Sequence, residues 1–124
     1  MADRPRLAVL MDPIASIKPR KDSTLAMMLA AQGRGIEVFC FEQRHLWCRD
    51  GVAMATLFPV TVRDDASSWF TLGAPLRAPL ASVDAVLMRK DPPFDTEYIY
   101  TTYLLERAES EGCLIVNRPQ GLRD

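Results

Sequence analysis

Net charge, histidine and paired cysteines are all scarce in this sequence, and each shortage excludes a class of function. The formal net charge is −1, so no general electrostatic attraction draws the protein to nucleic acids or to anionic membranes. His45 is the single histidine, and Cys40, Cys48 and Cys113 show no CxxC spacing, so a zinc site is not expected. Unpaired thiols in a reducing cytoplasm are expected instead.

Long hydrophobic runs and glycine-rich nucleotide motifs are also missing. The longest apolar runs, such as AMMLAA at residues 26–31, fall far short of the ~20 residues that cross a bilayer. The first residues hold no signal-peptide core, because Asp12 and Pro13 interrupt the apolar run before them. Neither GxGxxG nor GxxxxGKS/T occurs, which excludes the dinucleotide fingerprint and the P-loop. These absences indicate a cytoplasmic protein with no membrane segment.

The sequence does contain an alternation of strand and helix patterns. Residues 1–124 have the length of one domain. The first part predicts a strand, a helix and a strand, which form a βαβ unit with parallel strands and a right-handed crossover. The two strands are Arg6–Met11 and Ile36–Glu42. The helix between them has Asp22 or Ser23 as its N-cap and ends at Gly33 or Gly35. One face of this helix carries Leu25, Met28, Leu29 and Gln32.

The middle of the chain predicts a different kind of structure. Asp50 and Gly51 stand between two extended stretches, which is a strong hairpin signal. Residues 67–72, SSWFTL, predict a short strand or a helical turn, and residues 73–80, GAPLRAPL, a connection punctuated by proline.

The strand and helix alternation then returns. The two strands are Asp84–Met88 and Cys113–Asn117. The helix between them runs from Asp95 or Thr96 to about Ser110, and Gly112 ends it. This helix is expected to bury Thr101, Leu104, Leu105 and Ala108 and to expose Glu106, Arg107 and Glu109. The sum is an α/β fold, an open Rossmann-like and mostly parallel sheet with an inserted β-hairpin.

Ligands of open α/β sheets bind outside the carboxyl ends of the strands, which directs attention to three loops. The loops MDPIASIKPRKDS, MRKDPPFD and NRPQ each follow a predicted parallel strand and combine proline with charged or amide residues. Arg89 is the best anchor among them, because a guanidinium can hold a carboxylate with two parallel hydrogen bonds. The N-termini of the helices near Ser23 and Thr96 add backbone donors.

Structural roles compete with these functional ones. Arg89 and Asp91 can pair within their loop or with Asp12, and Asp22 and Asp95 are better explained as helix caps than as ligand groups. The basic run of Lys18, Arg20 and Lys21 is typical of a solvated loop, and Ser16 and Ser23 have no histidine partner that would activate a nucleophile. No catalytic and no metal-binding residue is predicted. The pattern indicates a carboxylate-binding half-site.

Three stretches carry a closer resemblance. VLMDPIASIKPRKDSTLAMMLAAQGRG, VLMRKDPPFDTEYIYTTYLLERAESEG and LIVNRPQGLRD closely resemble the N-terminal, pre-ATP-grasp domain of the bacterial glutathione synthetase family. The similarity covers essentially the whole chain and is weakest from about Trp47 to Leu80. The resemblance implies that residues 1–124 form this domain, that they are an N-terminal piece, and that the ATP-grasp part lies outside the chain.

The resemblance also implies a function for the full-length protein. Such a ligase joins γ-glutamylcysteine to glycine with ATP and Mg²⁺ (Mn²⁺ is the alternative metal) to give glutathione through an acyl phosphate. The family's glycine-rich lid, ATP-binding lysines and acidic metal ligands have no counterpart here, so the isolated chain should not catalyse ligation or bind these cofactors. The implied partners are the peptide substrates, the C-terminal ATP-grasp domains and other subunits of a homo-oligomer; nucleic acids and membranes are not among them.

The positions that match the family's substrate loops are Asp12, Pro13, Ile14 and Ser16 in the first loop and Arg89 and Asp91 in the second. The resemblance implies that Arg89 binds a carboxylate of the peptide and that the first loop shapes its glutamyl or cysteinyl end. Two other classes of function stay open: a stand-alone module that binds a small peptide or amino acid, and a structural domain that docks subunits.

Overall fold

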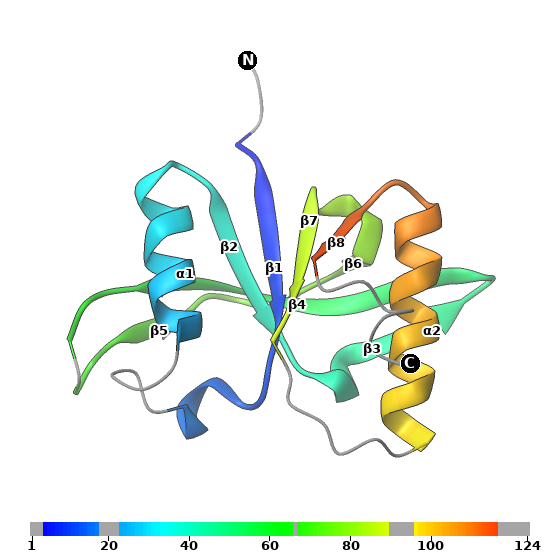
Figure 1. Cartoon of the computed structure of the whole chain (residues 1–124), viewed down its shortest axis with the longest axis horizontal. Helices are drawn as coiled ribbons and strands as arrows, with labels where there is room; N and C mark the ends of the chain where they lie inside the picture. The colour runs from blue at the N-terminus through cyan, green and yellow to red at the C-terminus, as the bar shows by residue number, and fades with distance from the viewer. Residues whose placement is uncertain (1–3, 18–22, 66, 90–95, 117–124) are drawn as a thin grey trace.

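The computed structural model describes residues 4–17, 23–65, 67–89 and 96–116, and Figure 1 shows their arrangement. Two α-helices, three short 3₁₀-helices and eight strands follow one another in these residues. Their order is β1 (Arg6–Leu10), η1 (Ile14–Ser16), α1 (Ser23–Gly33), β2 (Glu37–Phe41), η2 (Gln43–His45), β3 (Leu46–Arg49), β4 (Val52–Val62), β5 (Phe70–Leu72), β6 (Leu76–Pro79), η3 (Leu80–Ser82), β7 (Ala85–Met88), α2 (Thr96–Ser110) and β8 (Leu114–Val116).

The sheet confirms the predicted fold class. Its strand order is β3-β4-β2-β1-β7-β8, and β2, β1, β7 and β8 run parallel at its centre and at one end. The helices α1 and α2 lie on opposite sides of these strands (Figure 1), which is the arrangement that right-handed crossovers in opposite directions produce. Neither described helix is long and apolar enough to span a bilayer.

The antiparallel part is larger than the predicted hairpin. β4 pairs with β2 and β3, and also with β5 and β6. The expectation that residues 73–80 form only a connection is wrong, because Leu76–Pro79 is strand β6. Pro75 precedes this strand and Pro79 is its last residue. Proline has no backbone N–H to donate, but β6 pairs with a described strand on one side only, and an edge strand tolerates the loss of a donor. Of the two alternatives for residues 67–72, the strand is the one that forms, as β5.

The hairpin between β3 and β4 turns at the predicted dipeptide. Asp50 and Gly51 both have positive φ, 51° and 78°, which is the requirement of a two-residue type I′ turn. The side chain of Arg107 on α2 donates a hydrogen bond from Nε to the carbonyl oxygen of Gly51. The second helix therefore fixes the tip of a hairpin that lies 56 residues away in the chain.

Helix α1 is attached to the sheet by packing and by one amide side chain. Leu25 and Met28 are buried as the spacing predicts, and the helix ends at Gly33, before a Gly35 with a φ of 80°. The Gln32 side chain donates to the carbonyl oxygen of Val62 and accepts from its N–H, both at 2.9 Å. The Gln32 amide thus satisfies both backbone groups of Val62, at the end of β4, as a neighbouring strand would otherwise do.

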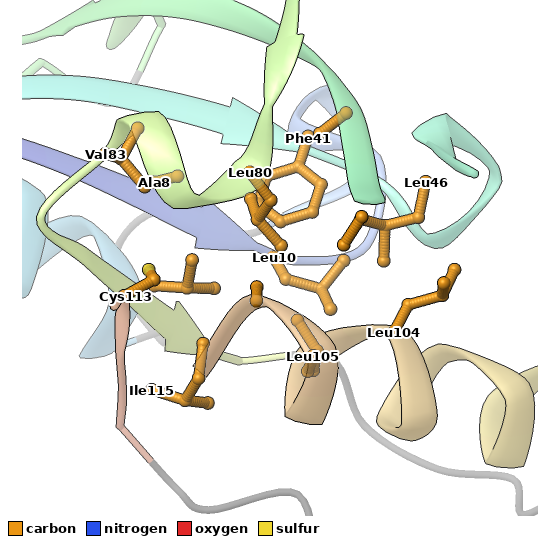
Figure 2. Close-up of a cluster of buried hydrophobic side chains, with 14 of the residues drawn as sticks. Ala8, Leu10, Phe41, Leu46, Leu80, Val83, Leu104, Leu105, Cys113 and Ile115 are labelled. Carbon is orange, nitrogen blue, oxygen red and sulfur yellow. The ribbon is translucent and has the colours of Figure 1, made fainter. Parts of the chain in front are cut away.

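The core has one cluster on each side of the sheet. We call the larger one the α2-side cluster; it contains Ala8, Leu10, Phe39, Phe41, Leu46, Ala53, Ala55, Leu57, Leu80, Val83, Val86, Met88, Leu104, Leu105, Ala108, Cys113 and Ile115. Figure 2 shows Leu104 and Leu105 of α2 directed toward Leu10 and Leu46. The α1-side cluster contains Val9, Met11, Ile14, Leu25, Met28, Ala31, Val38, Cys40, Val60, Val62 and Trp69.

The buried face of α2 is the predicted one, with one addition. Thr101, Leu104, Leu105 and Ala108 are all buried. Thr102 is buried too, although its hydroxyl is polar. That hydroxyl donates to the carbonyl oxygen of Ile99 at 2.7 Å, so the helix itself satisfies the group and removes the cost of burying it.

Candidate functional site

The carboxyl ends of three parallel strands meet at one edge of the sheet. Leu10 of β1 is in register with Phe41 of β2 on one side and with Met88 of β7 on the other. The ladder continues for one more hydrogen bond on each side, from Met11 to Phe41 and from Arg89 to Leu10, at 3.1 and 2.8 Å. The loop after β1 and the side chain after β7 are therefore neighbours, as the sequence predicts.

The loop after β1 is a compact turn. Ile14–Ser16 forms the 3₁₀-helix η1. The N–H and the hydroxyl of Ser16 both donate to the carbonyl oxygen of Pro13, at 2.8 and 2.6 Å. Ile14 is buried in the α1-side cluster. The turn is thus fixed by local hydrogen bonds and by one apolar anchor, which leaves Asp12 half-buried at the sheet edge.

Arg89 contacts the first turn of α1. Its Nη2 donates to the hydroxyl of Ser23 at 2.5 Å, and its Nε donates to the hydroxyl of Thr24 at 3.4 Å. Hydroxyl groups orient a guanidinium without neutralising its charge. The N-terminal end of a helix also carries positive partial charge. Guanidinium and helix terminus therefore present positive potential to the same volume, which suits a carboxylate or a phosphate.

Some predicted groups lie outside the described residues. These are Asp91, the basic run of Lys18, Arg20 and Lys21, the cap candidates Asp22 and Asp95, and the NRPQ loop. The helices α1 and α2 begin at Ser23 and Thr96, and the cap interpretation of the two aspartates stays a prediction.

A pocket of about 190 Å³ opens beside the loop after β1. It is lined by Met11, Asp12, Ile14, Cys40, Phe41, Glu42, Arg44, His45, Phe58 and Leu72. Apolar side chains form most of this set, and a few charged groups complete it. Such a lining can hold a small ligand that has an apolar part and a polar end.

Sequence reasoning missed the pocket wall formed by Glu42, Arg44 and His45. These residues follow β2, a parallel strand, so the rule that selected the other loops also applies to them. Arg44 Nε lies 2.9 Å from Glu42 Oε1. The N–H of Glu42 donates to Nδ1 of His45 at 2.9 Å, and the N–H of His45 donates to the carbonyl oxygen of Glu42 at 2.9 Å. The short helix η2 is closed by these reciprocal bonds.

His45 is held as a neutral donor. Desolvation lowers the pKa of its imidazole; the Glu42 carboxylate opposes this effect, and Arg44 adds to it. Because Nδ1 accepts a hydrogen bond, the neutral ring carries its proton on Nε2. The ring is also tilted against Phe58 with centroids 5.0 Å apart. The imidazole is therefore suited to donate a hydrogen bond rather than to act as a cationic group.

The buried thiols should make stability depend on pH in the alkaline range. Desolvation, followed by the Glu42 charge, raises the pKa of Cys40 to about 12, and burial raises the pKa of Cys113 to about 11. Thiols of the unfolded chain ionise near ~8.5, so above that pH the unfolded state binds fewer protons and is favoured. We expect the free energy of unfolding to fall by on the order of 1 kcal/mol per pH unit for each thiol.

Urea unfolding at pH 7, 9 and 10 measures this effect. The variant Cys40→Ala should show a shallower alkaline loss than the parent, whereas Cys48→Ser, which removes an exposed thiol, should keep the parent's slope. Equal slopes for the Cys40→Ala variant and the parent would contradict the assignment.

The structure is an α/β domain whose candidate site lies at the carboxyl ends of its parallel strands. Comparisons with known proteins show the family to which this domain belongs. The family described as "Prokaryotic glutathione synthetase, N-terminal domain" matches residues 6–123. Glutathione synthetases of Pseudomonas putida, Shewanella oneidensis and Vibrio cholerae are 56%, 55% and 54% identical to the chain over 119 residues, 96% of its length. The chain belongs to the prokaryotic glutathione synthetase N-terminal domain family. It spans only 37–38% of the length of these relatives.

Proposed function

We propose that the longer protein containing this chain ligates γ-glutamylcysteine and glycine, with hydrolysis of ATP to ADP and phosphate, in the second step of glutathione biosynthesis. The observation that carries the proposal is the similarity to proteins named glutathione synthetase, at 54–56% identity over 96% of the chain. We place this ligase in the cytoplasm and expect it to be a homo-oligomer. Residues 1–124 form its N-terminal domain.

In this proposal the chain provides one wall of the peptide site. Arg89 binds a carboxylate of γ-glutamylcysteine, supported by its position between the end of β7 and the first turn of α1. Asp91 orients Arg89 or contacts the peptide. The turn Asp12–Ser16 shapes the glutamyl or cysteinyl end, because Asp12 and Ile14 line the adjacent pocket.

ATP and Mg²⁺ belong to the rest of the longer protein in this proposal. When bound, ATP supplies the phosphoryl group that activates the cysteinyl carboxylate as an acyl phosphate. Within the described residues no group of three or more His, Cys, Asp or Glu side chains is arranged to hold a metal ion, and the chain contains no glycine-rich nucleotide motif. The contribution of this chain is to bind and orient the peptide whose carboxylate reacts.

A coupled assay of ADP formation tests the proposal. With the longer protein, we expect ADP release that requires both γ-glutamylcysteine and glycine, since the amine of glycine completes the reaction. Residues 1–124 alone should form no ADP under the same conditions. Binding of the peptide by the longer protein without ADP formation would overturn the ligase proposal in favour of a binding module.

A further inference from the structure

The apolar surface of the sheet continues beyond the helix that covers it. In the parallel strands β1, β7 and β8, residues in register share one face of the sheet. Val9 is therefore followed across the sheet by Leu87 and then by Val116, and Leu7 is followed by Ala85 and then by Leu114. Both rows begin under α1 and end at β8, the last strand of the order.

Burial decreases steadily along these rows. Val9 is 0% exposed in the α1-side cluster, Leu87 is half-buried at its margin, and Val116 is 40% exposed. In the second row Leu7 and Ala85 are half-buried, and Leu114 is 60% exposed. We call Ala85, Leu87, Leu114 and Val116 the open face.

The other side of the same strands is fully covered. Val86 of β7 and Ile115 of β8 point to the opposite side, where they are 0% and 2% exposed and pack in the α2-side cluster. Strands that are buried on both faces read as continuous apolar runs, and the strand sequences AVLM and LIV have this character. The composition of β7 and β8 is that of strands with two covered faces. Among the described residues, however, the α1-side cluster reaches only as far as Leu87, at its margin.

We propose that the open face is the docking surface for the polypeptide that follows this domain in the longer protein. The inference rests on the proposal that the chain is one domain of that protein. The relatives are more than twice as long as the chain, which matches 37–38% of them and corresponds to their N-terminal domain. β8 is the last described element before that remainder, and it carries the two most exposed side chains of the face.

The chemistry of the face specifies the segment it takes. The four side chains of the open face are aliphatic or alanine and contribute no charge. A contiguous exposed apolar patch of this kind is typical of an interaction surface. The occupant is therefore a segment of the following polypeptide that presents an apolar side to β7 and β8, as α1 presents Leu25 and Met28 to β1 and β2.

Thiol labelling measures whether the face is covered. The variants Leu114→Cys and Val116→Cys are made separately in a Cys48→Ser background. Each then has one exposed cysteine, because Cys40 and Cys113 are buried. Leu76→Cys is the matched control, since Leu76 lies on β6 and is 41% exposed. In the longer protein, maleimide should react at least tenfold more slowly at positions 114 and 116 than at 76. In residues 1–124 alone, the three rates should be similar.

Each other result overturns the proposal. Comparable rates at 114, 116 and 76 in the longer protein would show that the face stays open there. Protection within residues 1–124 that increases with protein concentration would identify a second copy as the occupant. Hydroxyl-radical footprinting of the unsubstituted proteins at Leu114 and Val116 gives the same comparison without substitutions. The labelling rates do not depend on ligase activity. If the longer protein has no ligase activity but positions 114 and 116 are protected, the proposed reaction is wrong and this inference still holds.

Discussion

Replacing Arg89 with alanine in the longer protein should reduce kcat/KM for γ-glutamylcysteine by about 100-fold or more. A guanidinium that holds a carboxylate makes two charge-assisted hydrogen bonds, and losing one partner of such a pair typically costs ~2–5 kcal/mol. The fold should survive, because the backbone N–H of Arg89 keeps its 2.8 Å hydrogen bond to the carbonyl oxygen of Leu10. Steady-state kinetics with varied peptide and saturating glycine and ATP measure the effect.

A graded series separates charge from geometry. Arg89→Lys retains the charge and loses the planar fork, so its activity should lie between those of the parent and the Arg89→Ala variant. Ser23→Ala removes a hydroxyl that orients the guanidinium and should raise KM with a smaller effect than Arg89→Ala. Arg77→Ala is the matched control, because that guanidinium lies over Trp47, 5.0 Å from the ring centroid, away from the strand ends. Unchanged KM and kcat in the Arg89→Ala variant would remove Arg89 from the site.

Much of the fold could be predicted because local signals agree with the tertiary structure. The period of Leu25 and Met28 fixes the buried side of α1, and the Asp50–Gly51 turn has the φ angles that its sequence requires. Strand β6 escaped prediction because its stability comes from pairing with β4, which lies 19 residues earlier at Leu57↔Leu76 and 25 residues earlier at Met54↔Pro79. Proline-based local rules contain no information about such a distant partner.

The positions of the candidate loops at the strand ends could be predicted from the sequence, whereas the contacts made there could not. Placing Arg89 at a strand end follows from the apolar run before it. Its contact with Ser23 and Thr24 joins residues 65 and 66 positions apart, so periodicity could not identify hydroxyls as its partners. Glu42 and His45 follow β2, so the strand-end rule could have identified them. Phe58 and Leu72, which complete the pocket from the antiparallel strands β4 and β5, carry no such local signal.

Leu105→Ala is expected to have a large effect on stability. Leu105 is 0% exposed and lies in the α2-side cluster, close to Leu10 in Figure 2. Truncating a buried leucine costs ~3–5 kcal/mol, because transfer free energy is lost and a cavity remains. The cost should be at the upper end here, since the side chain joins α2 to the sheet and rigid strands surround it. Urea denaturation of residues 1–124 measures the change.

The same helix offers a matched control for this substitution. Ile99 is 41% exposed on α2, and its carbonyl oxygen, which accepts from Thr102, is retained in the Ile99→Ala variant. Both substitutions replace a branched aliphatic residue with alanine on one helix, so intrinsic helix propensity differs little between them. The Ile99→Ala variant should lose about 0.5 kcal/mol or less, as is usual at exposed positions. Equal losses for the two variants would mean that α2 is not packed on the sheet.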